Sequence, residues 1–185
     1  MLRHSPIALL VPSILSVASC GLLCADPAQA KPVDYIATLS GQSATIRTGS
    51  SARGTATISV DMAAKTVAIR LNITGMAIEA LWDRLVKAPI GPIHLHQYAN
   101  GNLADAGASE LAFPLPYGKS YKSTSKGFRV TTGALPYAKA VAPLGQQASF
   151  ETFVAALEKG TVVLNVHTDA FNEGEINGAV VKGGG

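Results

Sequence analysis

Short segments in which apolar and polar residues alternate recur along this chain, and they constrain its fold more than any other feature. Residues 54–60 alternate through Ala56, Ile58 and Val60, and residues 66–73 repeat the pattern after the polar turn 61–65. A period of two buries one face of a strand, and a short polar turn between two such segments predicts a β-hairpin. Similar segments rich in Val, Ile and Thr occur at residues 35–40, 92–96, 111–115, 161–167 and 175–181. We therefore predict a mainly β protein, an antiparallel β-sandwich or barrel-like domain with one or two short helices.

Two segments have helical rather than strand periodicity. The first, residues 76–87, has apolar residues spaced three and four apart, which predicts a short amphipathic helix: Ile78, Leu81, Trp82 and Leu85. In the second, Ser149 precedes apolar residues at helical spacing and Gly160 follows them. Serine is a preferred helix start and glycine a preferred stop, so we predict a helix of about ten residues between them.

Residues 116–145 contain prolines and lysines but few periodic positions, so we predict a long surface loop inserted into the domain. We interpret a loose group of bases within it as a solvated loop surface: Lys119, Lys122, Lys126 and Arg129. The formal net charge of the whole chain is +3, and aromatic and basic residues do not interleave as a single-strand binder requires. Nucleic acid is therefore not an expected partner.

The first 30 residues have the pattern of a secretory signal. Arg3 is followed by an apolar run over residues 7–23 and by the small-residue site Ala28-Gln29-Ala30. We predict cleavage near Ala30, which leaves residues 31–185 as a single periplasmic or secreted domain without a transmembrane segment. An alternative is a lipoprotein anchored at Cys20, because Val17-Ala18-Ser19-Cys20 resembles a lipobox.

The cysteines and serines indicate a binding protein rather than an enzyme. Both cysteines, Cys20 and Cys24, lie within the predicted signal, so residues 31–185 contain neither a disulfide nor a thiol nucleophile. No serine lies in a Gly-x-Ser-x-Gly elbow, and no glycine-rich phosphate loop is present.

Three histidines form a candidate metal site. His94 and His96 are two residues apart on a predicted strand, so both point to one face, and His167 ends another strand. Two imidazoles spaced this way can share one ion, with His167 as a third ligand and Glu175 as a fourth. Three nitrogens and an oxygen suit copper or zinc. The alternative is that these side chains, together with Asn165 and Thr168, form a wet strand face and brace the strand ends by hydrogen bonds.

Three blocks of the sequence resemble the CHRD (chordin-type) domain family. They are Gly54-Thr55-Ala56-Thr57-Ile58 with the strand after it, Gly91-Pro92-Ile93-His94-Leu95-His96, and Val163-Leu164-Asn165-Val166-His167-Thr168 with Gly174-Glu175-Ile176-Asn177-Gly178. The sequence departs from the usual family pattern at Gln97-Tyr98 and at Asn177. The resemblance implies a β-sandwich-like domain, found in extracellular and bacterial exported proteins, without an established enzymatic activity.

These observations leave three functional hypotheses. The first is an exported protein that carries or buffers copper or zinc through the three histidines. The second is an extracellular adhesion or interaction module, in which the histidines are structural and residues 116–145 contact another exported protein. The third is a redox enzyme of the superoxide dismutase kind, by analogy with the His-x-His pair that such enzymes carry on a β-scaffold.

Overall fold

The computed structural model describes residues 31–43, 47–105, 107, 109–145 and 148–184. The predicted signal, including Cys20 and Ala30, lies outside the described residues. None of the helices in the described part of the chain is long and apolar enough to cross a membrane.

The described residues form one ten-stranded sheet in which every pair of neighbouring strands is antiparallel. Its order is β5-β4-β9-β10-β1-β2-β3-β7-β6, and β8 pairs with β3 outside this path. The strands are β1 (Val33–Ser40), β2 (Arg53–Asp61), β3 (Thr66–Thr74), β4 (Ile93–Tyr98), β5 (Ser109–Leu115), β6 (Tyr121–Thr124), β7 (Gly127–Thr131), β8 (Leu135–Pro136), β9 (Val162–Val166) and β10 (Ile176–Lys182). The mainly β, antiparallel prediction is confirmed.

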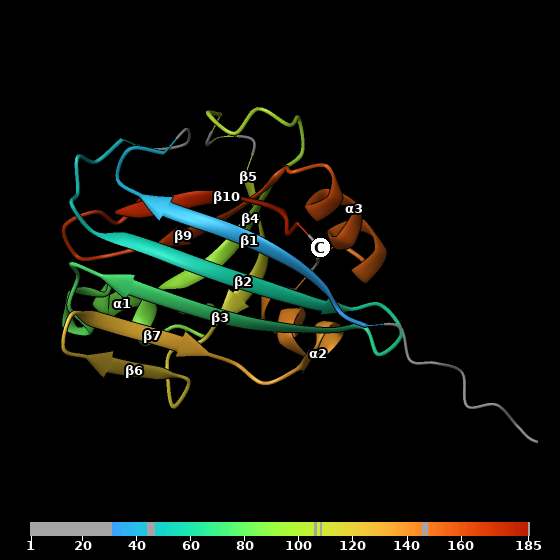
Figure 1. Cartoon of the computed structure of the whole chain (residues 1–185), viewed down its shortest axis with the longest axis horizontal. Helices are drawn as coiled ribbons and strands as arrows, with labels where there is room; N and C mark the ends of the chain where they lie inside the picture. Colours follow the sequence, from blue (N-terminus) through green and yellow to red (C-terminus); the bar gives the residue numbers. More distant parts are fainter. Residues whose placement is uncertain (1–30, 44–46, 106, 108, 146–147, 185) are drawn as a thin grey trace, which may run out of the picture.

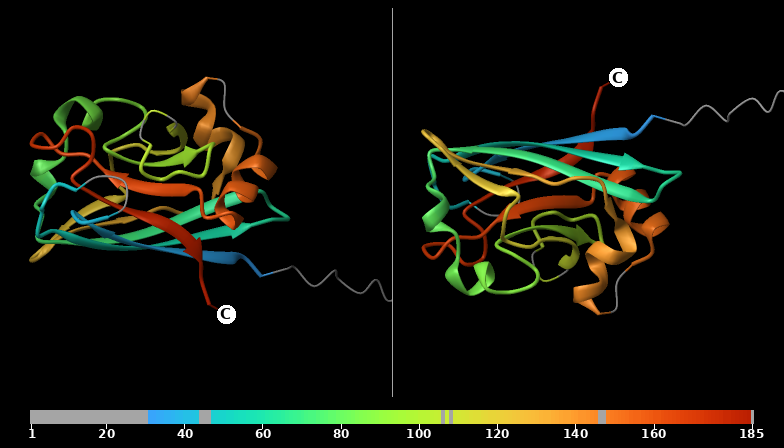
Figure 2. Two further views of the ribbon diagram at one scale, coloured as in Figure 1. Left: turned by 90° about the horizontal axis from the view of Figure 1, so that it is seen from above. Right: turned by 90° about the horizontal axis from the view of Figure 1, so that it is seen from below.

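The sheet curls so that its two halves face each other across the core. Figure 1 and the two views of Figure 2 show β1, β2 and β3 in one layer and β4, β5 and β9 in the other. Side chains from both layers, among them Ile58, Ile69, Leu95 and Leu164, are fully buried between them. Alternation in β1, β2 and β3 supplies one wall of this core, and their other face is largely exposed.

Short helices lie at both ends of the layers. The predicted helix over 76–87 is instead a 3₁₀ turn, η1 (Ile78–Ala80), followed by the single turn α1 (Asp83–Val86). The helix after Ser149 is confirmed as α3 (Phe150–Glu158), where the Ser149 hydroxyl accepts a hydrogen bond from the Thr152 amide at 3.2 Å. At the other end of α3, Gly160 adopts φ 68°, as expected of a helix stop. In Figure 1, α1 lies at one end of the molecule and α3 at the other.

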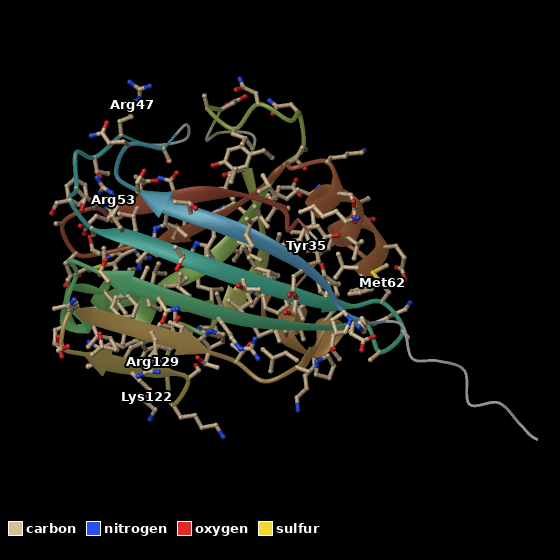
Figure 3. All side chains as sticks on the ribbon, viewed as in Figure 1. Tyr35, Arg47, Arg53, Met62, Lys122 and Arg129 are labelled. Atoms are coloured by element: carbon tan, nitrogen blue, oxygen red, sulfur yellow. The ribbon has the colours of Figure 1, made fainter. Side chains whose placement is uncertain are left out.

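The predicted surface loop over 116–145 is wrong, because this segment contains β6, β7, β8, the helix α2 (Tyr137–Val141) and the 3₁₀ turn η3 (Ala142–Leu144). Strand β7 pairs with β3, and Phe128 and Val130 are buried against the core. Lys122 and Arg129, interpreted as loop bases, are paired residues on the exposed face of β6 and β7 (Figure 3). The alternation was missed because each strand is short and separated from the next by tight turns.

Candidate metal centre

The pairing of β4 with β9 positions the three histidines. His94 and His96 are two residues apart on β4, so their side chains leave the same face of the sheet. In the register between the strands, His94 lies opposite Asn165, and His167 follows two residues after Asn165 at the end of β9. All three imidazoles therefore meet on one face, as the sequence predicts.

The three imidazole rings are in mutual contact. The His94 ring centroid lies 4.5 Å from that of His167, with the rings stacked, and 4.8 Å from that of His96. The centroids of His96 and His167 are 6.2 Å apart. One ligand nitrogen of each histidine lies within 4.8 Å of the others, and these three residues are the only such group of His, Cys, Asp and Glu among the described residues.

Backbone carbonyls determine the tautomers of two of these rings. The His94 Nδ1 lies 3.1 Å from the Gly91 carbonyl oxygen, and the His167 Nδ1 lies 2.8 Å from the Asn172 carbonyl oxygen. A carbonyl oxygen only accepts, so Nδ1 donates its proton in both rings and Nε2 keeps a lone pair. Metal-binding histidines are usually oriented by this kind of second hydrogen bond.

Both ring nitrogens of His96 and the Nε2 of His167 are buried. His94 is 4% and His167 7% exposed; His96 is less buried as a residue, but both of its ring nitrogens are inaccessible. Neither nitrogen of His96, nor Nε2 of His167, has a hydrogen-bond partner within the described part of the chain. Leaving such groups unpaired inside a protein costs free energy, so a hydrogen-bond partner or a bound ligand is expected at these nitrogens.

Burial lowers the pKa of all three imidazoles, and repulsion from neighbouring rings lowers the pKa of His94 and His96 further. Desolvation is the main cause, and the neighbouring imidazoles add to it, so that the pKa of His94 falls from 6.5 to about 3 and that of His96 to about 4. The pKa of His167 is also lowered by burial, against the raising effects of its bond to Asn172 and of the Glu173 charge. The three rings are therefore neutral near pH 7, which is the form that binds metals.

A comparison with known protein families matches residues 35–180 to the CHRD domain. The chain belongs to the CHRD domain family. The match spans β1 to β10 and includes all three histidines, so the resemblance noted from the sequence is confirmed. Comparison of this CHRD domain with curated proteins and with solved structures gave no match.

Glu175 lies outside the histidine group of the CHRD domain. Its two carboxylate oxygens accept hydrogen bonds from the Ser50 hydroxyl at 2.6 Å and the Thr168 hydroxyl at 2.8 Å. Thr48 also donates to the backbone carbonyl of Glu175 at 2.7 Å. The carboxylate thus ties the chain before β2 to the turn after β9. The hypothesis of Glu175 as a fourth ligand is not supported by this geometry, whereas its interpretation as a hydrogen-bond acceptor agrees with it.

The histidine face is not the wet strand face considered from the sequence, because most of its polar residues on β4, β9 and β10 are buried. Asn165 is 3% exposed and Asn177 is fully buried, alongside His94 and His167. Sequence reasoning assigned Asn165 only a bracing role, and its position two residues before His167 was the one available signal that it shares the histidine face. The turn after His167 is braced as expected, since Thr168 accepts from the Phe171 amide.

Proposed function

We propose that this CHRD domain binds one copper or zinc ion through His94, His96 and His167, and that the protein carries or buffers this ion. The observation that supports the proposal is the convergence of three neutral, buried imidazoles whose ligand nitrogens lie within 4.8 Å of one another. Imidazole nitrogen is a preferred ligand of both metals, whereas Mg²⁺ and Ca²⁺ prefer oxygen.

The distances are compatible with one ion after a small contraction. Zinc binds imidazole nitrogen at about 2.0–2.1 Å with tetrahedral geometry, so two nitrogens on one ion lie about 3.4 Å apart. The three nitrogens here lie within 4.8 Å of one another. Side-chain rotations that move each nitrogen by up to about 1 Å close this gap, and the hydrogen bonds from Nδ1 of His94 and His167 keep Nε2 available.

The energetic cost of the unpaired ring nitrogens also supports a ligand. A buried polar atom without a partner costs about 1–3 kcal/mol, and the three nitrogens of His96 and His167 are in that state. An ion would coordinate at least one nitrogen on each ring and offset part of this cost. If these three positions had only a structural role, apolar side chains would fill them without the cost of unpaired nitrogens.

We extend this proposal to an exported protein, because Arg3, the apolar run and the Ala28-Gln29-Ala30 site have the pattern of a signal. The mass of the protein recovered from its native host tests this directly. A first residue at Lys31 is expected, whereas a lipid-modified Cys20 would support the lipoprotein alternative.

The deciding experiment is metal stoichiometry and affinity of residues 31–185, by elemental analysis and by titration with zinc and copper. We expect about one tightly bound ion per chain, and loss of that ion in the double variant His94→Ala/His96→Ala. Gln97→Ala, on the same strand but outside the cluster, is the matched control and should keep the ion. An ion retained by the double variant, or absent from the wild type, would overturn the proposal.

A dismutase-like activity stays a hypothesis, which superoxide turnover by the copper-loaded protein would test.

A further inference from the structure

Asn165 also carries a buried polar atom on the histidine face that lacks a partner in the described part of the chain. It lies directly opposite His94 in the β4–β9 ladder and two residues before His167, so its side chain leaves the same face of the sheet as these two imidazoles. The residue is 3% exposed, and its Oδ1 is buried without a hydrogen-bond partner in the described part of the chain.

The neighbouring asparagine provides a contrast. Asn177 lies opposite Asn165 on β10, on the same face but one strand further from the histidines. Its Oδ1 accepts a hydrogen bond from the Ser43 hydroxyl. Two buried asparagines thus stand side by side, and the one whose oxygen is left unpaired is the one adjacent to His94.

Glycine leaves open the space beside the Asn165 amide. A side chain at Gly174 would place its first carbon 3.6–3.7 Å from the Asn165 amide atoms, and the backbone φ of 118° at Gly174 disfavours any such side chain. Neither a neighbouring polar group nor a side chain at Gly174 therefore satisfies this oxygen. The carboxylate of Glu175, next along the chain, is hydrogen-bonded to Ser50 and Thr168 and lies outside the histidine group.

We propose that Asn165 Oδ1 is the fourth donor to the ion held by His94, His96 and His167, and that the site takes a divalent ion. This inference rests on the proposed function. A donor set of three imidazole nitrogens and one amide oxygen suits Zn²⁺ and Cu²⁺, whereas Cu⁺ favours softer sulfur ligands and gains little from an amide oxygen. All four donors are neutral, so the bound ion keeps its full charge in the site.

The test uses Co²⁺ as a spectroscopic probe and Zn²⁺ for affinity, on residues 31–185. We expect a four-coordinate Co²⁺ absorption spectrum in the wild type. In Asn165→Ala the bands should shift and weaken, and zinc affinity should fall about 10–100-fold, as for loss of a supporting or weak ligand. Asn177→Ala is the matched control: it removes a buried asparagine from the same face and should leave both the spectrum and the zinc affinity unchanged.

A second variant keeps the test decisive if Asn165→Ala does not fold. Asn165→Asp offers a charged oxygen at the same position, so it should shift the Co²⁺ bands and bind zinc more tightly than the wild type, while Asn177→Asp should not. Variants at Asn165 with the wild-type spectrum and affinity would overturn the role of Asn165 but leave the three-histidine site intact. A wild type that binds neither Co²⁺ nor Zn²⁺ would instead overturn the proposed function itself.

Discussion

Among single residues, His96 combines two buried ring nitrogens with a strongly lowered pKa. Both of its ring nitrogens are buried and unpaired in the described part of the chain, and burial together with His167 lowers its pKa to about 4. The unfolded chain has no such restriction, and there the imidazole titrates near 6.5. The difference between these two values links the stability of the metal-free protein to pH.

We expect the metal-free protein to lose stability as the pH falls below about 6.5. The unfolded state takes up protons on its histidines from there downward, while folded His96 stays neutral until about pH 4. Each such histidine then costs the folded state about 1.4 kcal/mol per pH unit. Urea unfolding between pH 6 and 5, with chelator present, measures the slope of unfolding free energy against pH. This range lies above the pH at which most carboxylates titrate.

His96→Leu should reduce the slope of unfolding free energy against pH by the contribution of one histidine. At pH 7 we expect the variant to be at least as stable as the metal-free wild type, because an apolar side chain replaces an unsatisfied one. Gln97→Ala serves as the control and should keep the wild-type slope. Parallel slopes for His96→Leu and the wild type would show that His96 is protonated, or hydrated, in the folded state.

At the scale of elements, the β6–β7 hairpin is part of the core rather than an appendage. Phe128 of β7 lies opposite Ile73 of β3, and both are essentially inaccessible to solvent. Strand β7 extends the layer that β1, β2 and β3 form. Removing residues 116–145 to test for a partner-binding loop would therefore remove core side chains as well.

Phe128→Ala should destabilise the protein by about 3–5 kcal/mol, since it leaves a cavity in the core. Lys122→Ala, on the exposed face of the same hairpin, should change stability by no more than about 0.5 kcal/mol. Denaturant unfolding of both variants measures the difference. A Phe128→Ala cost as small as that of Lys122→Ala would instead mean that this segment is a surface loop.

At the scale of the whole molecule, the histidine cluster connects two strands that are far apart in sequence. An ion bound there would link β4 to the end of β9 and bind the folded state alone. Such binding adds about 2.7 kcal/mol of stability when the free metal is at 100 times its Kd. For a chain of this size that corresponds to a rise in Tm of about 5–10 °C.

Thermal unfolding with and without zinc tests this linkage. We expect the wild type to show the rise, and His94→Ala/His96→Ala to show none. An equal rise in both proteins would indicate zinc binding outside the cluster, and no rise in either would argue against the metal site.

The sequence by itself was sufficient for most of the local features, with residues 76–87 and 116–145 as the exceptions. A period of two identifies strands directly, and Ser149 and Gly160 mark the ends of α3, because these signals depend on neighbours a few residues away. The His94–His96 pair and the family blocks are equally local. Two imidazoles spaced by two on a strand share a face whatever the rest of the fold does.

Only the tertiary structure decided which side chains these strands bring together and which of them are buried. Whether β9 lies beside β4 depends on the strand order of the whole sheet, and that pairing brings His167 and Asn165 to His94. Burial of the polar face, and the hydrogen bond of Glu175 to Ser50, likewise depend on segments distant in sequence. The physical reason is that strand propensity is a local property, whereas solvent access and the partner of each polar atom are set by long-range packing.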